Sequence, residues 1–402
     1  MVFLQKHAQI ALGYFLIIAA LGVALRLFSV FDMPITYRFV VHGHSHIALL
    51  GWVYTGLTTL MYFLFLRKKH LGRKYRILFW ATQTTLIGML ISFPFTGYAL
   101  FSILFSTLFL LTSYVFTFLF LKHSAAVQRN RPSHILLRTA LWYMVLSSIG
   151  PWALGIIMVT LGNDSHWYKN AIYFYLHFQY NGWFLVALVA LFFYLLESMS
   201  VTLSRQNFRL FYNLLNAGVI LTFFISLLWM EPHPVIYGLA ALGGVLQIGA
   251  FTLLFAKVLN NRFTLAKRLP SSTKYFLKLA AICLAIKLIA QVMGVFPAPA
   301  QIISGNIDFV ISYLHWVFLG FVSVGIFAFL NHFKLATISK NVTVAYMGAF
   351  LTTEVLIFYR GAVAAFDAPP LPHLNLWLGV ASSLLMLAIG WMFLQNVISK
   401  SN

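Results

Sequence analysis

The chain has 402 residues, of which 61% are hydrophobic and only 8% are charged. A soluble domain normally carries about 25% charged residues and needs polar side chains to cover its surface. This composition excludes an ordinary soluble protein and predicts an all-α membrane protein. The net charge of +20 would also suit a nucleic-acid-binding protein, but the distribution of the basic residues argues against that class.

Apolar runs of the length that crosses a bilayer, ~20 residues, follow one another along the whole sequence. They predict about twelve transmembrane helices in a single transmembrane domain, residues 1–402. The first run is too long for the apolar region of a signal peptide, so we interpret it as a span. The number of spans depends on a joint between two helices from Pro94 to Tyr98. If this joint is wrong, the number of spans falls by two or becomes odd. The expected spans are residues 8–31, 38–66, 76–97, 99–121, 135–162, 169–197, 209–230, 233–257, 275–298, 306–331, 341–360 and 373–397.

Lys and Arg are concentrated in every second loop. The segments Arg67–Arg76 and Lys122–Arg138 are strongly basic, whereas the loops between them carry almost no Lys or Arg. Because positively charged loops stay in the cytoplasm, this alternation predicts a multi-pass protein of a bacterial-type inner (plasma) membrane with both termini in the cytoplasm. The expected partner of the positive charge is therefore the lipid bilayer, and no nucleic acid is expected.

A short pattern, H-x4-G-[WF], occurs three times. The copies are His46–Trp52, His177–Trp183 and His315–Phe321, and they fall in the second, sixth and tenth expected spans. Copies separated by four spans each time predict three pseudo-repeated four-helix units, at about residues 1–130, 131–268 and 269–402. The glycine of each copy would let a neighbouring helix or a flat ligand approach closely.

The repeated histidines are candidates for a shared binding site. Each lies 8–10 residues from the non-basic end of its span, roughly 12–15 Å deep at the rise of an α-helix. Ionisable groups at that depth are costly and usually face the bundle interior, and imidazole is the commonest metal ligand. Span two adds His42, on the same helix face as His46, and His44, which faces roughly the opposite way. Alternatively, these histidines only form hydrogen bonds between helices.

Twelve spans in three four-helix units, with histidines on the second, sixth and tenth, resemble the haem–copper oxidase catalytic subunit. That superfamily includes cytochrome oxidases and nitric oxide reductases. The stretch His42–Trp52 also resembles a segment of the NnrS family, which is linked to nitric oxide stress. The resemblance implies a membrane haem protein that transfers electrons, or binds or reduces oxygen or nitric oxide, as an oxidoreductase if it is an enzyme.

The resemblance also implies roles for individual residues. His42, His44 or His46 would pair with His315 around a haem b, and His177 would bind copper, a second haem or another metal. Departures put a complete haem–copper centre in doubt, because span ten has one histidine and span seven has no histidine pair. Cys283 is the only cysteine, which excludes a CxxCH haem attachment.

Arginines at the non-basic ends of their spans could hold the haem propionates, and Arg38 and Arg360 are the main candidates. An electron donor would be a separate cytochrome c or a quinol. A histidine-lined transporter or metal-handling permease is the alternative, because internal repeats also build transporters. Lys287 lies inside span nine and Glu354 inside span eleven. Either residue could serve a proton route, pair with another group or line a polar cavity.

Overall fold

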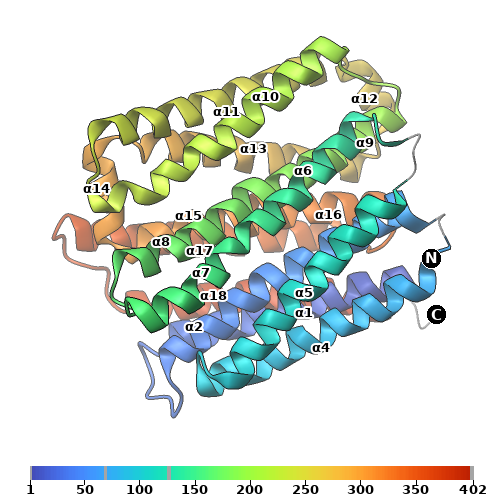
Figure 1. The fold of residues 1–402 in the computed structure, drawn as a ribbon. Helices are drawn as coiled ribbons and strands as arrows, with labels where there is room; N and C mark the ends of the chain where they lie inside the picture. Colours follow the sequence, from blue (N-terminus) through green and yellow to red (C-terminus); the bar gives the residue numbers. More distant parts are fainter. Residues whose placement is uncertain (1, 68–69, 125–127, 399–402) are drawn as a thin grey trace. The chain divides into compact units, whose positions relative to one another are not determined.

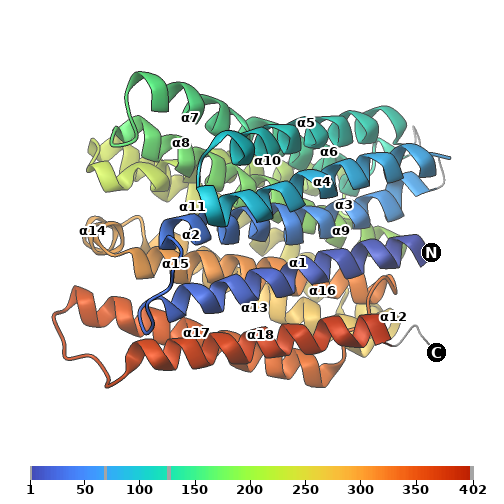
Figure 2. The same cartoon turned by 90° about the horizontal axis from the view of Figure 1, so that it is seen from below.

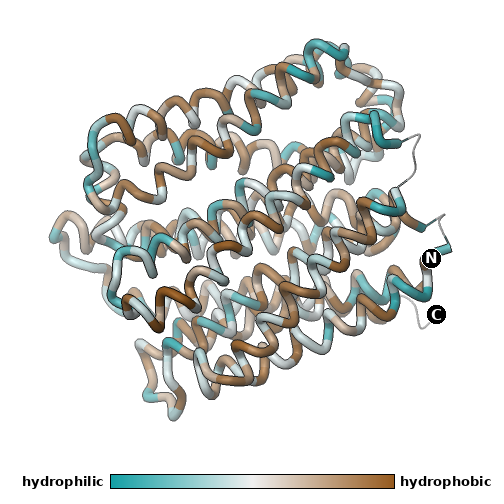
Figure 3. Tube along the Cα trace, in the orientation of Figure 1, coloured by the Kyte–Doolittle hydropathy of each residue, from teal (hydrophilic) through white to brown (hydrophobic). Residues whose placement is uncertain are grey.

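The computed structural model describes residues 2–67, 70–124 and 128–398. Two residues of the basic loop after span two, Lys68 and Lys69, lie outside this range. The described residues are mostly helical and contain no strand, and twelve helical segments are long and apolar enough to cross a membrane. Figure 3 shows apolar residues along most of their length. The chain is an all-α, multi-pass membrane protein, and the prediction of fold class is confirmed.

The twelve segments begin and end close to the expected spans. They are Val2–Leu27, Tyr37–Leu66, Gly72–Thr96, Leu100–His123, Pro132–Thr160, His166–Ser198, Arg205–Met230, Pro234–Asn260, Ser271–Met293, Ile307–His332, Lys340–Ala365 and Leu374–Ile398. The doubtful joint between spans three and four separates two helices. Gly97, with φ +59°, ends the third span, since glycine adopts this left-handed conformation without strain.

The chain divides into two compact units, residues 1–125 with 325–402, and residues 126–324. In the first unit, α1 packs on α18, α17 on α18, and α4 on α5, and Figure 2 shows α17 and α18 side by side. The helices of this unit are α1 (Val2–Leu27), α2 (Tyr37–His46), η1 (Ile47–Tyr54), α3 (Thr55–Met61), η2 (Tyr62–Leu66), α4 (Gly72–Thr96), α5 (Leu100–His123), α16 (Ser323–His332, from Gly325 onward), α17 (Lys340–Ala365) and α18 (Leu374–Ile398).

In the second unit, α10 packs along α11 (Figure 1) and α6 along α9. Its helices are α6 (Pro132–Ser147), α7 (Ile149–Thr160), α8 (His166–His177), η5 (Phe178–Phe184), α9 (Leu185–Ser198), α10 (Arg205–Leu221), η6 (Thr222–Met230), α11 (Pro234–Asn260), α12 (Arg262–Arg268), α13 (Ser271–Met293), α14 (Pro297–Gly305), α15 (Ile307–His315) and η7 (Trp316–Val322). This division into two compact units does not test the three pseudo-repeated four-helix units, which remain a prediction.

Candidate functional site

Each of the three repeated histidines is the last residue of an α-helix that continues as a π-helix. His46 ends α2 before η1, His177 ends α8 before η5, and His315 ends α15 before η7. π-helical turns are rare and occur frequently at functional sites. The three copies therefore share a local backbone conformation as well as a sequence pattern.

The repeated glycine is covered by a tyrosine of the preceding span in two copies. A Cβ atom at Gly51 would lie 2.9 Å from Cγ of Tyr14 in α1. One at Gly182 would lie 2.7 Å from both Cβ and Cγ of Tyr143 in α6. Of the two interpretations of this glycine, close approach of a neighbouring helix is the one observed at both positions.

The three histidines of α2 point in two directions. The His42 and His46 rings both lie against the ring of Tyr98, with centroids 4.6 and 5.9 Å away. The Nδ1 atom of His44 instead donates to the carbonyl oxygen of Ile18 in α1, at 3.0 Å. The expectation that His42 and His46 share a face while His44 points elsewhere follows from helical spacing, and these contacts agree with it.

His46 is held in one tautomer by its own helix. Its Nδ1 atom is 2.8 Å from the carbonyl oxygen of His42, and because a carbonyl only accepts, Nδ1 carries the proton. The Nε2 atom is then the unprotonated nitrogen, and it lies 3.5 Å from the Tyr98 hydroxyl. The ring of Phe93 stacks on the imidazole at 4.3 Å. A metal-binding histidine usually has its other nitrogen fixed by a carbonyl or carboxylate in this way.

His177 uses both of its ring nitrogens within the bundle. Nε2 donates to the carbonyl oxygen of Val219 in α10, at 2.8 Å, and the Asn181 amide donates to Nδ1 at 3.3 Å. The side chain is 1% exposed, so water does not compete for these bonds. This arrangement matches the helix-linking role that the sequence left open. Metal ligation by His177 stays a prediction, and it would require one of these two hydrogen bonds to break.

The residues around the second-unit histidines pack against one another. Tyr180 of η5 lies edge-on to Tyr313 of α15, with ring centroids 6.3 Å apart, and Gln179 donates to Ser147 at 3.0 Å. His315 is half-buried. The indole of Trp316 donates to the carbonyl oxygen of Cys283 at 2.9 Å. Packing between helices accounts for the contacts of these aromatic side chains.

The two candidate propionate-binding arginines lie at helix ends of the first unit. Arg38 is exposed in the first turn of α2. Arg360, near the end of α17, donates to the Asn375 side chain of α18 at 3.4 Å. Contact of either arginine with a haem remains a prediction.

A polar cluster surrounds Lys287 in the second unit, and the sequence did not predict its other members. Its ammonium donates to the side-chain oxygens of Gln291, at 2.6 Å, and Gln247, at 3.3 Å. Gln247 in turn donates to Thr222 at 3.0 Å, and the side chains of these four residues are at most 5% exposed. No carboxylate contacts Lys287 among the residues described, so neutral amide oxygens alone solvate this amine.

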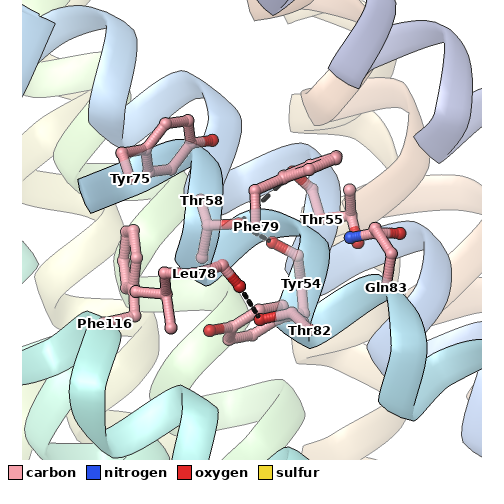
Figure 4. Close-up of a pocket in the computed structure, with 9 residues that line it drawn as sticks. All are labelled: Tyr54, Thr55, Thr58, Tyr75, Leu78, Phe79, Thr82, Gln83 and Phe116. Carbon is pink, nitrogen blue, oxygen red and sulfur yellow. Dashed lines mark hydrogen bonds between the residues drawn. The ribbon is translucent and has the colours of Figure 1, made fainter. Parts of the chain in front are cut away.

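A small cavity in the first unit is lined by hydroxyl, amide and aromatic groups. Figure 4 shows Tyr75, Thr82 and Gln83 of α4 facing Thr55 and Thr58 of α3 across it. The Tyr75 hydroxyl and Gln83 Oε1 have no hydrogen-bond partner in the described part of the chain. The cavity has a volume of only about 10 Å³, far below that of typical ligand pockets. It suits buried water and not a cofactor.

The histidines fit a metal or haem only in part. His46 fits, because Nδ1 is occupied and Nε2 is presented as a lone pair. Within the described ranges, no three His, Cys, Asp or Glu side chains come together in a way that could hold a metal ion. The expected pairing of span two with His315 joins residues of different units and stays a prediction.

Comparison with known proteins gives no further assignment. The sequence matches no protein-family model and no curated protein. The resemblance to the haem–copper oxidase catalytic subunit therefore rests on span number and on the repeated histidines alone.

Tyr98 is the residue beside the histidines that sequence reasoning missed. It follows the joint between spans three and four, 52 residues from His46, and no repeat or spacing rule connects the two. Its position could have indicated this contact, because Tyr98 directly follows Gly97 at the membrane edge where span two begins.

Proposed function

We propose that the chain is a membrane metalloprotein of the redox or gas-binding type, with the iron of a haem b bound by an imidazole of span two. The observation that carries the proposal is the fixed tautomer of His46, whose Nδ1 atom is bonded to the carbonyl oxygen of His42. His44 has the same kind of bond to Ile18. Two imidazoles of one span thus have Nδ1 anchored to backbone, the arrangement that supports ligation through Nε2.

The residues have distinct tasks in this proposal. His44 or His46 would bind the haem iron through a ring nitrogen, and His315 is the expected second ligand from the family resemblance. When bound, haem supplies reversible one-electron chemistry or an iron that takes a diatomic gas. The protein orients the imidazole through the backbone carbonyl, and the ring of Phe93 packs on that of His46.

The cellular setting is part of the same proposal. Basic loops on one side of the membrane support a cytoplasmic location of both termini in a bacterial-type inner membrane. Electrons would come from a separate cytochrome c or from a quinol.

An optical spectrum of the purified protein, recorded before and after dithionite, tests the proposal. We expect a Soret band with sharp reduced peaks, loss of the low-spin signal in His315→Ala and in one of His44→Ala and His46→Ala, and an unaffected spectrum in the control His166→Ala. A colourless protein expressed with ample haem would refute the proposal. Carbon monoxide added to the reduced protein reports whether the iron has an open position.

A transporter is the second candidate, and a specific observation favours it. Spans two, six, seven and ten each change helix type along their length, and interrupted helices are typical of transporter binding sites. The buried Lys287 cluster beside the change in span seven, at Thr222, adds a polar group of the kind that marks ion pathways. Uptake of a substrate or ion by liposomes containing a haem-free protein, abolished by Lys287→Met, would favour this candidate.

A further inference from the structure

We propose that His42, His46 and Tyr98 form a binding site for a bare divalent transition-metal ion, copper(II) or zinc, at one end of span two. All three residues belong to the first unit. The site needs no residue of the second unit, and it uses His46. His44, whose Nδ1 atom is also bonded to a backbone carbonyl, is then the residue of span two that would bind the haem iron of the proposed function.

The distance between Tyr98 and His46 is the first support. The hydroxyl oxygen and Nε2 are 3.5 Å apart, whereas a hydrogen bond from a hydroxyl has a typical length of about 2.7–2.8 Å. Donors that each lie about 2.0–2.1 Å from a tetrahedral metal are themselves about 3.4 Å apart. The observed separation therefore matches one edge of a coordination tetrahedron better than it matches a good hydrogen bond.

His42 supplies a second imidazole on the same face. It precedes His46 by four residues, the spacing with which two helical histidines bind one metal ion. Its ring meets the Tyr98 ring edge-on with centroids 4.6 Å apart. Two imidazoles thus flank one phenol, and all three side chains are half-buried.

The donor set selects the metal. Two imidazole nitrogens and one oxygen suit copper(II) and zinc rather than calcium or magnesium, and copper(II) binds such sites most tightly. Coordination by Tyr98 releases its hydroxyl proton to solvent and leaves a phenolate. The negative charge is favourable because Arg38, one turn before His42, is the cation on this end of α2. Three protein ligands leave one position for water or a substrate.

The test uses the full-length protein in detergent. Metal content is measured by mass spectrometry directly after purification without added metal, and the stripped protein is then titrated with copper(II). We expect one tightly bound ion per chain, a visible phenolate-to-copper absorption band, and nitrogen hyperfine splitting from two imidazoles in the electron paramagnetic resonance spectrum.

Variants separate the three ligands. His42→Ala and His46→Ala should each weaken binding at least as much as loss of an orienting residue does, roughly tenfold or more. Tyr98→Phe should remove the visible band and weaken binding, while His166→Ala should change neither. Size-exclusion profiles identify any variant that fails to fold, and His46→Gln then replaces His46→Ala.

Several outcomes would overturn the site. Binding only at high copper concentration would show an adventitious ion, and an unchanged spectrum in Tyr98→Phe would remove the phenol from the set. An equal loss of binding in His166→Ala would show nonspecific chelation. Haem absorbance is recorded in the same samples, so failure of the metal site and failure of the haem proposal are read separately.

Discussion

Substitution of Gly182 by alanine tests whether close helix contact, rather than a ligand, is the reason for the repeated glycine. The new Cβ atom would lie 2.7 Å from Cβ and Cγ of Tyr143, where ordinary contacts begin at 3.4 Å. Both atoms lie at the root of the tyrosine side chain, so no rotamer change relieves the overlap, and the helices must move apart. Tyr143 is also fixed at its far end, where its hydroxyl donates to Asn216 at 2.9 Å.

The expected cost follows from two opposing terms. Overpacking of a buried site destabilises by about 1–3 kcal/mol, and the upper part of that range applies to a rigid contact. Replacing glycine in a helix by alanine returns about 0.5–1 kcal/mol. The net destabilisation is therefore about 1–2 kcal/mol, which should lower the apparent melting temperature of the detergent-solubilised protein by several degrees. Because unfolding of large proteins is often irreversible, all variants are compared at one scan rate.

Gly155 in α7 is the matched control, because no atom lies within 4 Å of a Cβ placed there. Gly155→Ala should leave the melting temperature unchanged or slightly raised. Combining Gly182→Ala with Tyr143→Gly should cost less than the sum of the two single changes, since the overlap is then absent. Wild-type stability in Gly182→Ala, or simple additivity in the double variant, would refute the packing explanation.

The remaining predictions concern polar groups of the second unit. The Glu197 carboxylate accepts bonds from the amide and hydroxyl of Ser133 at 2.9 and 2.7 Å. Glu197→Ala should therefore cost about 1–3 kcal/mol in thermal stability, with a smaller loss for Glu197→Gln, and equal losses would contradict this. Lys287→Met should be neutral or stabilising, since it removes a buried amine without a carboxylate partner. Gln247→Leu should destabilise by about 1–3 kcal/mol, because it takes one acceptor from that amine; the reverse order in melting temperatures would disprove this account.

Much of the fold could be predicted from the sequence. The joint at Pro94 to Tyr98 was the doubtful point, and the structure ends the third span there, at Thr96. The first span begins at Val2 rather than at residue 8, because a helix continues through Lys6 and His7 although these residues lower the local hydropathy. Such differences are confined to ends, where apolar composition does not decide how far backbone hydrogen bonding extends.

The change from α- to π-helix after His46, His177 and His315 could not be predicted. These stretches contain no proline, so the usual signal of a helix irregularity is absent. The packing of Tyr14 and Tyr143 against the repeated glycines involves other helices. A sequence pattern shows that three segments are alike, but the hydrogen-bond register depends on what each segment packs against.

The number and type of the spans were determined by the sequence alone, because hydropathy is a property of each short segment and lipid forces every such segment to satisfy its own backbone as a helix. The tertiary structure decided which groups of other helices the histidine nitrogens meet. His177 meets Val219 across 42 residues and His46 meets Tyr98 across 52. Only folding brings such distant groups together, and those contacts separate a histidine that links helices from one that still presents a lone pair.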